Sequence, residues 1–249
     1  DRGWYRDTHP NEILGAVYTS LIARSGLDPA VVEDLIIGCT APFGEQSRNI
    51  GRNAWLQAGY PAEVPAVTLD RRCGSAQTAV EMGAALIGSG THDIVIAGGV
   101  EHMGNHPIGD GLDPNPRFLA ERIVEQDALA MGATAERLHD RFPQLTKERA
   151  DRYAYNSQMK TAAAYAAGKI QRDLIPTAAR IPEMGWGIAT VDEPPRPTTT
   201  MEGLATLKTP FRPAGRVTPG NSSGLNDGAT AAILASEEKA NELGLTIKA

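Results

Sequence analysis

Cysteines, aromatic residues and long apolar runs are all scarce in this sequence. The 249 residues include two cysteines, Cys39 and Cys73, and 5% aromatic residues. Two cysteines are too few for a disulfide framework, and neither lies in the CxxC or Cys/His spacing typical of zinc ligands. This cysteine usage favours a reducing compartment, so we expect a cytoplasmic protein. No segment approaches the roughly 18 consecutive apolar residues of a membrane helix, so no membrane span is expected.

Basic residues are in the minority. The sequence has 24 Lys and Arg against 30 Asp and Glu, a formal net charge of −6. A general nucleic-acid binder needs a concentrated basic face, and this balance argues against one. A few local arginines would still suffice for a small phosphorylated ligand. The sequence also lacks a GxGxxG after a strand, a GxxxxGK[ST] and a GxSxG, which removes the dinucleotide, P-loop and serine-hydrolase interpretations.

Apolar residues are plentiful, at 41%, and their spacing alternates between that of helices and that of strands. Helices are predicted at residues 11 to 24, 49 to 58, 75 to 87, 132 to 141, 147 to 167 and 237 to 243. Strands are predicted at residues 35 to 40, 64 to 69, 93 to 99 and 229 to 236. Such alternation favours an α/β layered fold with a mainly parallel sheet and right-handed crossovers.

The middle of the chain has a different composition. Residues 104 to 117 are rich in Gly, Pro, Asn and Asp, and residues 182 to 200 carry four prolines. We therefore expect an α/β core in residues 1–104, an inserted loop subdomain in residues 105–210, and a return to the core in residues 211–249.

Cys73 is the strongest candidate for chemistry. It follows a predicted strand and lies at the first turn of the apolar helix 75 to 87. Free N–H groups and the positive end of the helix dipole favour a thiolate there, and a tight turn between strand and helix makes a nucleophile reachable. From this context alone Cys73 is either a nucleophile or a small buried residue. Cys39, inside an apolar strand, is predicted to pack in the core.

Two other segments carry polar or glycine-rich patterns. Residues 98 to 107, GGVEHMGNHP, are predicted to form a loop whose paired glycines permit close approach to a neighbouring element. Its residues His102 and His106 suggest a metal, but no third ligand is specified, and solvated or capping histidines are the commoner explanation. Residues 215 to 236, GRVTPGNSSGLNDGATAAILAS, offer many backbone donors for a phosphate, amide or carbonyl ligand, or else form a long turn.

Four segments taken together are more specific than any one of them. They are RRCGSAQTAV, AGGVEHM, MGATAE and RVTPGNSSGLNDGATAAILAS, with DTHPNEILGAV and LATLKTPF alongside. In this order they resemble the thiolase family of acetyl-CoA acyltransferases over essentially the whole chain. The resemblance implies the N-terminal half of a thiolase-like layered α/β fold, with a mainly parallel mixed sheet and helices on both of its faces. In this fold two similar halves pack their central helices together. The resemblance also implies that the inserted subdomain covers coenzyme A.

The resemblance assigns further roles residue by residue. Coenzyme A and acyl-CoA are the implied substrates, with no prosthetic group and no metal, and a homodimer or homotetramer is the expected assembly. Ser223 and Gly224 match positions that contact the pantetheine arm. Phe211 and Arg196 match positions near the coenzyme, and Met131 matches a position that lines the acyl pocket.

The implied reaction is thiolysis of a 3-ketoacyl-CoA, or the reverse condensation. Cys73 attacks the 3-keto carbon, acetyl-CoA leaves, and a second coenzyme A releases the shortened acyl group. The backbone N–H of Cys73 is expected to help hold the thioester oxygen. Ala130 stands where biosynthetic members have His, which favours a degradative enzyme, and Gly104 replaces the usual Ser.

The family's second half is not represented in this sequence. That half carries a His in a GHP motif, an Asn in NEAF and a Cys in CxGGG, and none of these motifs occurs here; the family's first strand is missing as well. We expect a truncated or processed chain that is inactive alone and is completed by a C-terminal half or a partner chain. The alternatives are a non-catalytic acyl-CoA-binding or scaffold protein with this fold, and a related ketoacyl synthase, whose family does not share GNSSGLNDGA.

Overall fold

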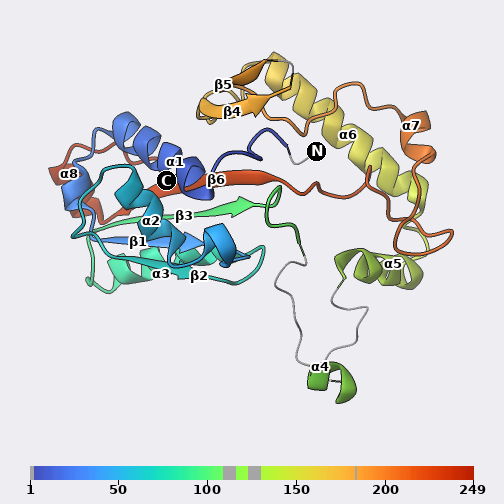
Figure 1. Cartoon of the computed structure of the whole chain (residues 1–249), viewed down its shortest axis with the longest axis horizontal. Helices are drawn as coiled ribbons and strands as arrows, with labels where there is room; N and C mark the ends of the chain where they lie inside the picture. The colour runs from blue at the N-terminus through green and yellow to red at the C-terminus, as the bar shows by residue number, and fades with distance from the viewer. Residues whose placement is uncertain (1–2, 109–115, 123–129, 183) are drawn as a thin grey trace. The chain divides into compact units, whose positions relative to one another are not determined.

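The computed structural model describes residues 3–108, 116–122, 130–182 and 184–249 (Figure 1). The chain forms two compact units, and each is described by itself. Unit 1 comprises Asp1–Gly111, Ile175–Thr190 and Leu225–Ala249, and unit 2 comprises Leu112–Leu174 and Val191–Gly224.

A four-stranded sheet forms the centre of unit 1. Its strands, in the order β2-β1-β3-β6, are β1 (Asp34–Gly38), β2 (Ala66–Leu69), β3 (Ile94–His102) and β6 (Asp227–Ala235). β1 pairs in parallel with both β2 and β3, and β3 pairs antiparallel with β6. The sheet is therefore mixed and mainly parallel, as predicted.

Helices cover both faces of this sheet (Figure 1). α1 (Pro10–Ser25) and α2 (Ile50–Gln57) pack on one face, and α3 (Ser75–Gly88) packs on the other. Unit 1 also contains the short helices η1 (Pro29–Val31), η2 (Gly44–Gln46) and α8 (Glu237–Glu242).

Alternation along β1 divides the core of unit 1 between the two faces. Leu35 and Ile37 face the cluster that includes Trp55 of α2. Ile36 points to the opposite side, where it meets Ala79 of α3. All five side chains are fully buried, and burying one large aliphatic side chain stabilises a fold by about 1.5–3 kcal/mol.

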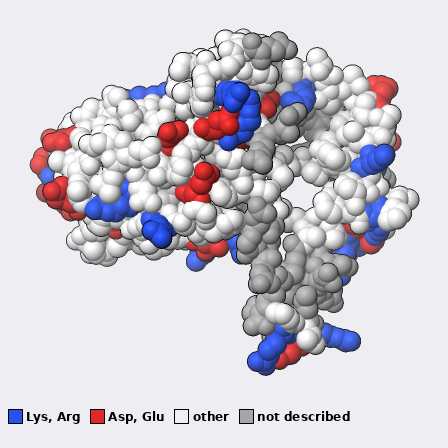
Figure 2. Space-filling model, in the orientation of Figure 1, with Lys and Arg blue, Asp and Glu red and all other residues white. Residues whose placement is uncertain are grey.

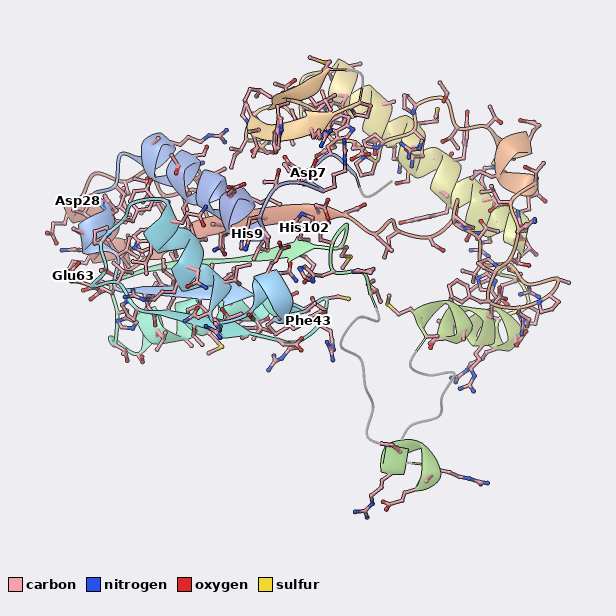
Figure 3. All side chains as sticks on the ribbon, viewed as in Figure 1. Asp7, His9, Asp28, Phe43, Glu63 and His102 are labelled. Carbon is pink, nitrogen blue, oxygen red and sulfur yellow. The ribbon has the colours of Figure 1, made fainter. Side chains whose placement is uncertain are left out.

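α1 begins at a capping box that the sequence analysis did not identify. Nδ1 of His9 accepts the N–H of Asn11 at 3.1 Å, and Oε2 of Glu12 accepts the N–H of His9 at 3.3 Å (Figure 3). Pro10 occupies the first helical position, where a missing N–H costs nothing. At the other end Gly26 caps the helix with a φ of 70°, a left-handed conformation that glycine adopts readily.

The described residues cover α3 on one of its faces and leave the other face exposed. Ala79 and Gly83 are buried against the sheet, whereas Val80 is 37% and Met82 is 42% exposed. A helix that is apolar on nearly every side, as residues 75 to 87 are, is expected to lie in the interior. Within unit 1, the side facing away from the sheet remains open.

β3 is longer than predicted. The sequence analysis treats residues 98 to 107 as a loop, but β3 continues to His102. Its last residues pair with the start of β6, where Glu101 lies opposite Gly228. The predicted strand ended at residue 99, so the prediction of a loop was wrong for residues 100–102, where pairing with the nine-residue strand β6 extends β3.

A two-stranded hairpin in unit 1 was not predicted. β4 (Thr177–Ile181) pairs antiparallel with β5 (Gly185–Ala189). Arg180 joins the hairpin to the N-terminal segment, because its Nη1 bonds to Asp7 at 2.7 Å and its N–H donates to the carbonyl of Trp4 at 2.9 Å. Each strand has only five residues, and β5 begins with glycine, so the local pattern does not reach that of a strand.

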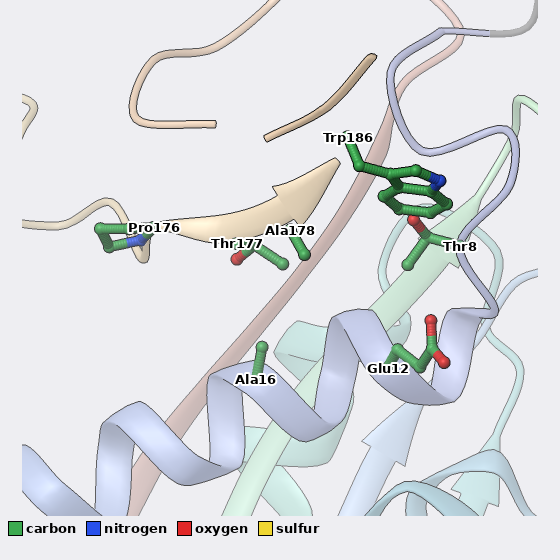
Figure 4. A pocket seen from close by; sticks show the side chains of 7 residues that line it. All are labelled: Thr8, Glu12, Ala16, Pro176, Thr177, Ala178 and Trp186. Carbon is green, nitrogen blue, oxygen red and sulfur yellow. The ribbon is translucent and has the colours of Figure 1, made fainter. Parts of the chain in front are cut away.

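A hollow of about 350 Å³ lies between α1 and this hairpin (Figure 4). Glu12 and Ala16 line it from α1, and Ala178 and Trp186 line it from the hairpin. None of the site residues predicted from the sequence lies on its wall.

Unit 2 is mainly helical. Its described helices are α4 (Pro116–Ala120), α5 (Met131–Arg141), α6 (Lys147–Ala166) and α7 (Met201–Ala205). Thr146 caps α6, because its hydroxyl accepts the N–H of Arg149 at 3.2 Å. The positions of α5 and α6 agree with the sequence analysis to within one residue at each end.

The two units do not follow the ranges expected from the sequence, which were 1–104, 105–210 and 211–249. The hairpin belongs to unit 1, and residues 211–224 belong to unit 2. Residues 109–115, in the Gly- and Pro-rich stretch where the insertion was expected to begin, lie outside the described residues.

Charged side chains of both signs are interspersed on the face drawn in Figure 2. Exposed ion pairs include Arg212 with Asp140 at 2.6 Å. Exposed pairs of this kind add little to stability. Within the described part of the chain, no helix is both long and apolar enough to cross a bilayer.

Candidate active site

Cys73 lies in the loop between β2 and α3, two residues before the helix begins. Its side chain is exposed. α3 starts after Gly74, which makes no side-chain hydrogen bond to the first N–H groups of the helix. An accessible thiol at an open helix N-terminus is the setting that covalent catalysis by cysteine requires.

A buried serine holds the loop that carries Cys73. Oγ of Ser75 accepts the N–H of Arg71 at 2.9 Å and donates to the carbonyl of Arg72 at 2.6 Å. Arg72 has a φ of 50°, a left-handed conformation that costs a non-glycine residue roughly 1–2 kcal/mol. The surrounding hydrogen bonds therefore have to stabilise this turn.

Glycines let α3 begin directly on the sheet. Gly38 of β1 and Gly99 of β3 are partners in the parallel pairing. A Cβ on Gly38 would lie 2.5 Å from the carbonyl carbon of Ser75, and one on Gly99 would lie 2.9 Å from Cβ of Ala76. On the other edge of β3, a Cβ on Gly98 would lie 2.0 Å from a carbonyl oxygen of β6. The close approach predicted for the paired glycines of β3 is confirmed.

Glu101 connects β3 to the loop behind Cys73. Its Oε2 accepts the N–H of Thr40 at 2.7 Å, and its Oε1 accepts Nε2 of Gln46 at 2.8 Å. The hydroxyl of Thr40 donates to the carbonyl of Arg72 at 3.1 Å. Hydrogen bonds thus run without a break from β3 to the residue that precedes Cys73.

His102 is fully buried, and both of its ring nitrogens are engaged (Figure 3). Nδ1 accepts the N–H of Asn105 at 3.2 Å, so the proton is assigned to Nε2, which lies 3.0 Å from the carbonyl of Tyr5. His106 instead packs its ring on Phe43, with centroids 5.5 Å apart. No group of three or more His, Cys, Asp or Glu that could hold a metal ion occurs among the described residues.

Cys39 has the opposite environment to Cys73. It is 1% exposed, which confirms the predicted core position. Burial, with a smaller contribution from the carboxylate of Glu101, raises the pKa of the Cys39 thiol to about 12. A thiol with that pKa is protonated at neutral pH and is a poor nucleophile.

All five residues predicted to bind the coenzyme lie in unit 2, and two of them come together at the start of α5. Met131 is the first residue of that helix and is exposed. Phe211 packs on the next residue, because a Cβ on Gly132 would lie 2.2 Å from a carbon of the Phe211 ring. The half-exposed Phe211 ring thus lies against the first turn of α5, the helix that Met131 begins.

The other three predicted residues lie in irregular segments of unit 2. The N–H of Arg196 donates to Oε1 of Gln158 on α6 at 2.7 Å, which attaches this segment to the helix. Ser223 and Gly224 are both exposed at the end of the Gly/Asn/Ser stretch.

Two buried carboxylates hold that stretch in place, and the sequence analysis did not identify them. Oε1 of Glu136 accepts the N–H groups of Arg216 and Val217, both at 2.7 Å. Oδ1 of Asp151 accepts Nδ2 of Asn221 at 2.9 Å. Some donors of the stretch thus serve the fold, and its exposed end remains open to a ligand.

Within each unit, the residues whose roles were not predicted from the sequence are those that hold loops in place by hydrogen bonds. Ser75 carries a usable signal, since a hydroxyl residue at the start of a helix commonly bonds to nearby backbone. Gln46, Glu136 and Asp151 carry none, because their partners lie 55, 80 and 70 residues away along the chain.

The fold and the exposed thiol define a cysteine-bearing α/β protein suited to covalent acyl transfer. A family model described as "Thiolase, N-terminal domain" matches residues 1–238. The chain belongs to the thiolase family.

Three relatives show how far the similarity extends. The chain is 42% identical to a protein of Saccharophagus degradans named 3-ketoacyl-CoA thiolase, over 98% of this chain and 62% of that protein. It is 39% identical to proteins of the same name from Vibrio vulnificus and Escherichia fergusonii, over 99% of this chain and 64% of each relative. The chain therefore spans less than two thirds of the length of these relatives.

Proposed function

We propose that this chain is the nucleophile-bearing part of a thiolase-type acyltransferase, with Cys73 as the acyl acceptor. The exposed thiol at the uncapped N-terminus of α3 carries this proposal. The relatives' name, 3-ketoacyl-CoA thiolase, supports a 3-ketoacyl-CoA and coenzyme A as substrates. The products are acetyl-CoA and an acyl-CoA shortened by the acetyl unit, and the reverse condensation uses the same groups.

Cys73 and the backbone around it supply the first half of the reaction. The thiolate forms a C–S bond to the 3-keto carbon, the bond between the second and third carbons breaks, and acetyl-CoA leaves as an enolate equivalent that takes up a proton. The N–H of Cys73 stabilises the negative oxygen of the tetrahedral intermediate. The thiol of a second coenzyme A then takes the acyl group and restores the free Cys73.

Unit 2 supplies the coenzyme-binding residues in this proposal. Ser223 and Gly224 contact the pantetheine arm, Phe211 and Arg196 lie near the coenzyme, and Met131 borders the acyl pocket. The exposure of Ser223, Gly224 and Met131 and the anchoring of the stretch by two buried carboxylates support these roles. The coenzyme is a substrate, and neither a prosthetic group nor a metal takes part.

Complete turnover needs groups that this chain does not carry. The family's acid/base His and second Cys lie in motifs absent from the 249 residues, so we propose that the chain alone takes up an acyl group without turning over. The open side of α3, with Val80 and Met82 exposed, is available to a C-terminal half or partner chain. A homodimer or homotetramer in the cytoplasm is the proposed assembly and location.

Alkylation with iodoacetamide, in the presence and absence of acetyl-CoA, tests this function. We expect Cys73 to react and Cys39 to stay unmodified in the folded chain, and we expect acetyl-CoA to slow the reaction of Cys73. ATP at the same concentration is the matched control, because it shares the adenine nucleotide and lacks the pantetheine arm. Equal slow labelling of both thiols, or no protection by acetyl-CoA, would overturn the proposal. Protection without any acylated Cys73 would favour a non-catalytic acyl-CoA-binding protein.

A further inference from the structure

We infer that Ser75 is a positioning residue for acyl transfer, whose buried hydroxyl sets the direction of the Cys73 thiol and of the Cys73 N–H. This inference rests on the proposed function and adds to it a residue that does not itself touch the substrate. Its basis is the set of hydrogen bonds that surround the two residues before Cys73.

The hydroxyl of Ser75 closes the loop from inside. It accepts the N–H of Arg71 at 2.9 Å and donates to the carbonyl of Arg72 at 2.6 Å, so it uses both of its roles on neighbouring peptide groups. The N–H of Ser75 also donates to that carbonyl, at 3.0 Å. Only 4% of Ser75 is exposed, so water is poorly placed to replace these bonds.

Arg72 is the residue that needs this support. Its φ of 50° is unfavourable for any residue other than glycine. The Arg72 carbonyl, which Ser75 holds, belongs to the same planar peptide group as the N–H of Cys73, so fixing the carbonyl fixes the direction of that N–H. Thr40 holds the same residue from the other side, since its hydroxyl donates to the Arg72 carbonyl at 3.1 Å. The N–H of Arg72 donates to Asp70 at 2.8 Å. If the turn relaxes, the thiol and the adjacent N–H lose their common orientation.

Acyl transfer and alkylation depend on this orientation to different degrees. In acyl transfer the thiolate must attack a carbonyl while an N–H lies where the oxyanion develops, so small misplacements are costly. Alkylation by iodoacetamide develops no oxyanion and needs only an accessible thiolate. A residue that positions the nucleophile should therefore affect acyl transfer far more than alkylation.

The test uses p-nitrophenyl acetate as acyl donor and iodoacetamide as alkylating agent on the 249-residue chain. In the acyl transfer, the Cys73 thiolate forms a C–S bond to the acetyl carbon, the ester C–O bond breaks, p-nitrophenolate leaves, and the thiol proton goes to the buffer. We expect Ser75→Ala to slow acetylation of Cys73 by about tenfold or more while alkylation changes by less than about twofold. Thr40→Val, which removes one bond to the Arg72 carbonyl, should produce a smaller loss in the same direction.

Ser89→Ala is the matched control, because Ser89 lies at the other end of α3 and its hydroxyl bonds to the carbonyl of Leu86. It should change neither rate. Unchanged acetylation in Ser75→Ala would overturn the positioning role. An equal loss of the acetylation and alkylation rates would also overturn it and would indicate that Ser75 has a structural role instead. If acetyl-CoA neither protects nor acylates Cys73 in the unaltered chain, the proposed function fails. If p-nitrophenyl acetate still discriminates between the variants in that case, the positioning of Cys73 by Ser75 stands.

Discussion

Replacing Gly38 by alanine should displace the start of α3 and lower both stability and reactivity. The added Cβ would lie 2.5 Å from the carbonyl carbon and 2.6 Å from the Cβ of Ser75, and 2.6 Å from the nitrogen of Ala76. Carbon atoms in contact are normally about 3.5–4.0 Å apart, so the helix has to move by about 1 Å. The obstacle is mainly backbone, which has no alternative rotamer. Overpacking of this kind costs about 1–3 kcal/mol.

Urea unfolding followed by circular dichroism measures that loss, and acetylation by p-nitrophenyl acetate measures the effect on Cys73. Gly88→Ala is the control, because Gly88 lies in the same helix and a Cβ there meets nothing within 4 Å. It should leave stability unchanged or raise it by about 0.4–1 kcal/mol. A Gly38→Ala variant that unfolds at the same urea concentration as the unaltered chain would refute the close approach of α3 to β1.

Two further predictions follow from buried ionisable groups. The pKa of Cys39 is raised from 9.0 to about 12, so its contribution to stability is complete below pH 9 and is lost as pH rises from about 9 to 12. Cys39→Ala removes this component. When the pH is raised from 8 to 10, the free energy of unfolding of this variant should therefore fall by about 1.4 kcal/mol less than that of the unaltered chain. Equal falls in the two proteins would contradict the raised pKa of Cys39. Glu136→Gln should destabilise unit 2 by about 1–3 kcal/mol and speed hydrogen exchange at Arg216 and Val217. The side-chain NH2 of the glutamine faces either Arg212, which it repels, or the two backbone N–H groups, which then lose their acceptor. Glu148→Gln, at an exposed position of α6, should change neither quantity, and a matching response of the two variants would count against the role of Glu136.

The longer helices and the strands of the central sheet could be predicted because their signals are local, whereas the short helices α4, α7, η1 and η2 were not predicted. α1, α3 and α6 end where Gly26, Gly90 and Gly168 follow, and their apolar spacing is visible in short windows. β3 was predicted to end at residue 99, because its extension to His102 depends on pairing with β6, which lies far away along the chain. The hairpin β4–β5 was missed because its stability depends on partners at the N-terminus, including Asp7.

In the candidate site, too, local signals could be predicted from the sequence and long-range contacts could not. Cys73 could be singled out from its position between a strand and a helix, although that context alone left a buried thiol equally open. The groups that orient it, Ser75, Thr40 and Glu101, form bonds that only the folded chain displays. Glu136 and Asp151 likewise look like ordinary helix carboxylates until the fold brings the Gly/Asn/Ser stretch onto them.

The most direct measurement of the central claim is to locate the acyl group after the chain has been mixed with a 3-ketoacyl-CoA. The reaction is quenched with acid, and the peptides that contain Cys73 and Cys39 are examined by mass spectrometry. The account predicts one acyl group on Cys73, none on Cys39, and none in a Cys73→Ser variant. An unmodified Cys73 peptide, or an acyl group that persists in Cys73→Ser, would contradict it.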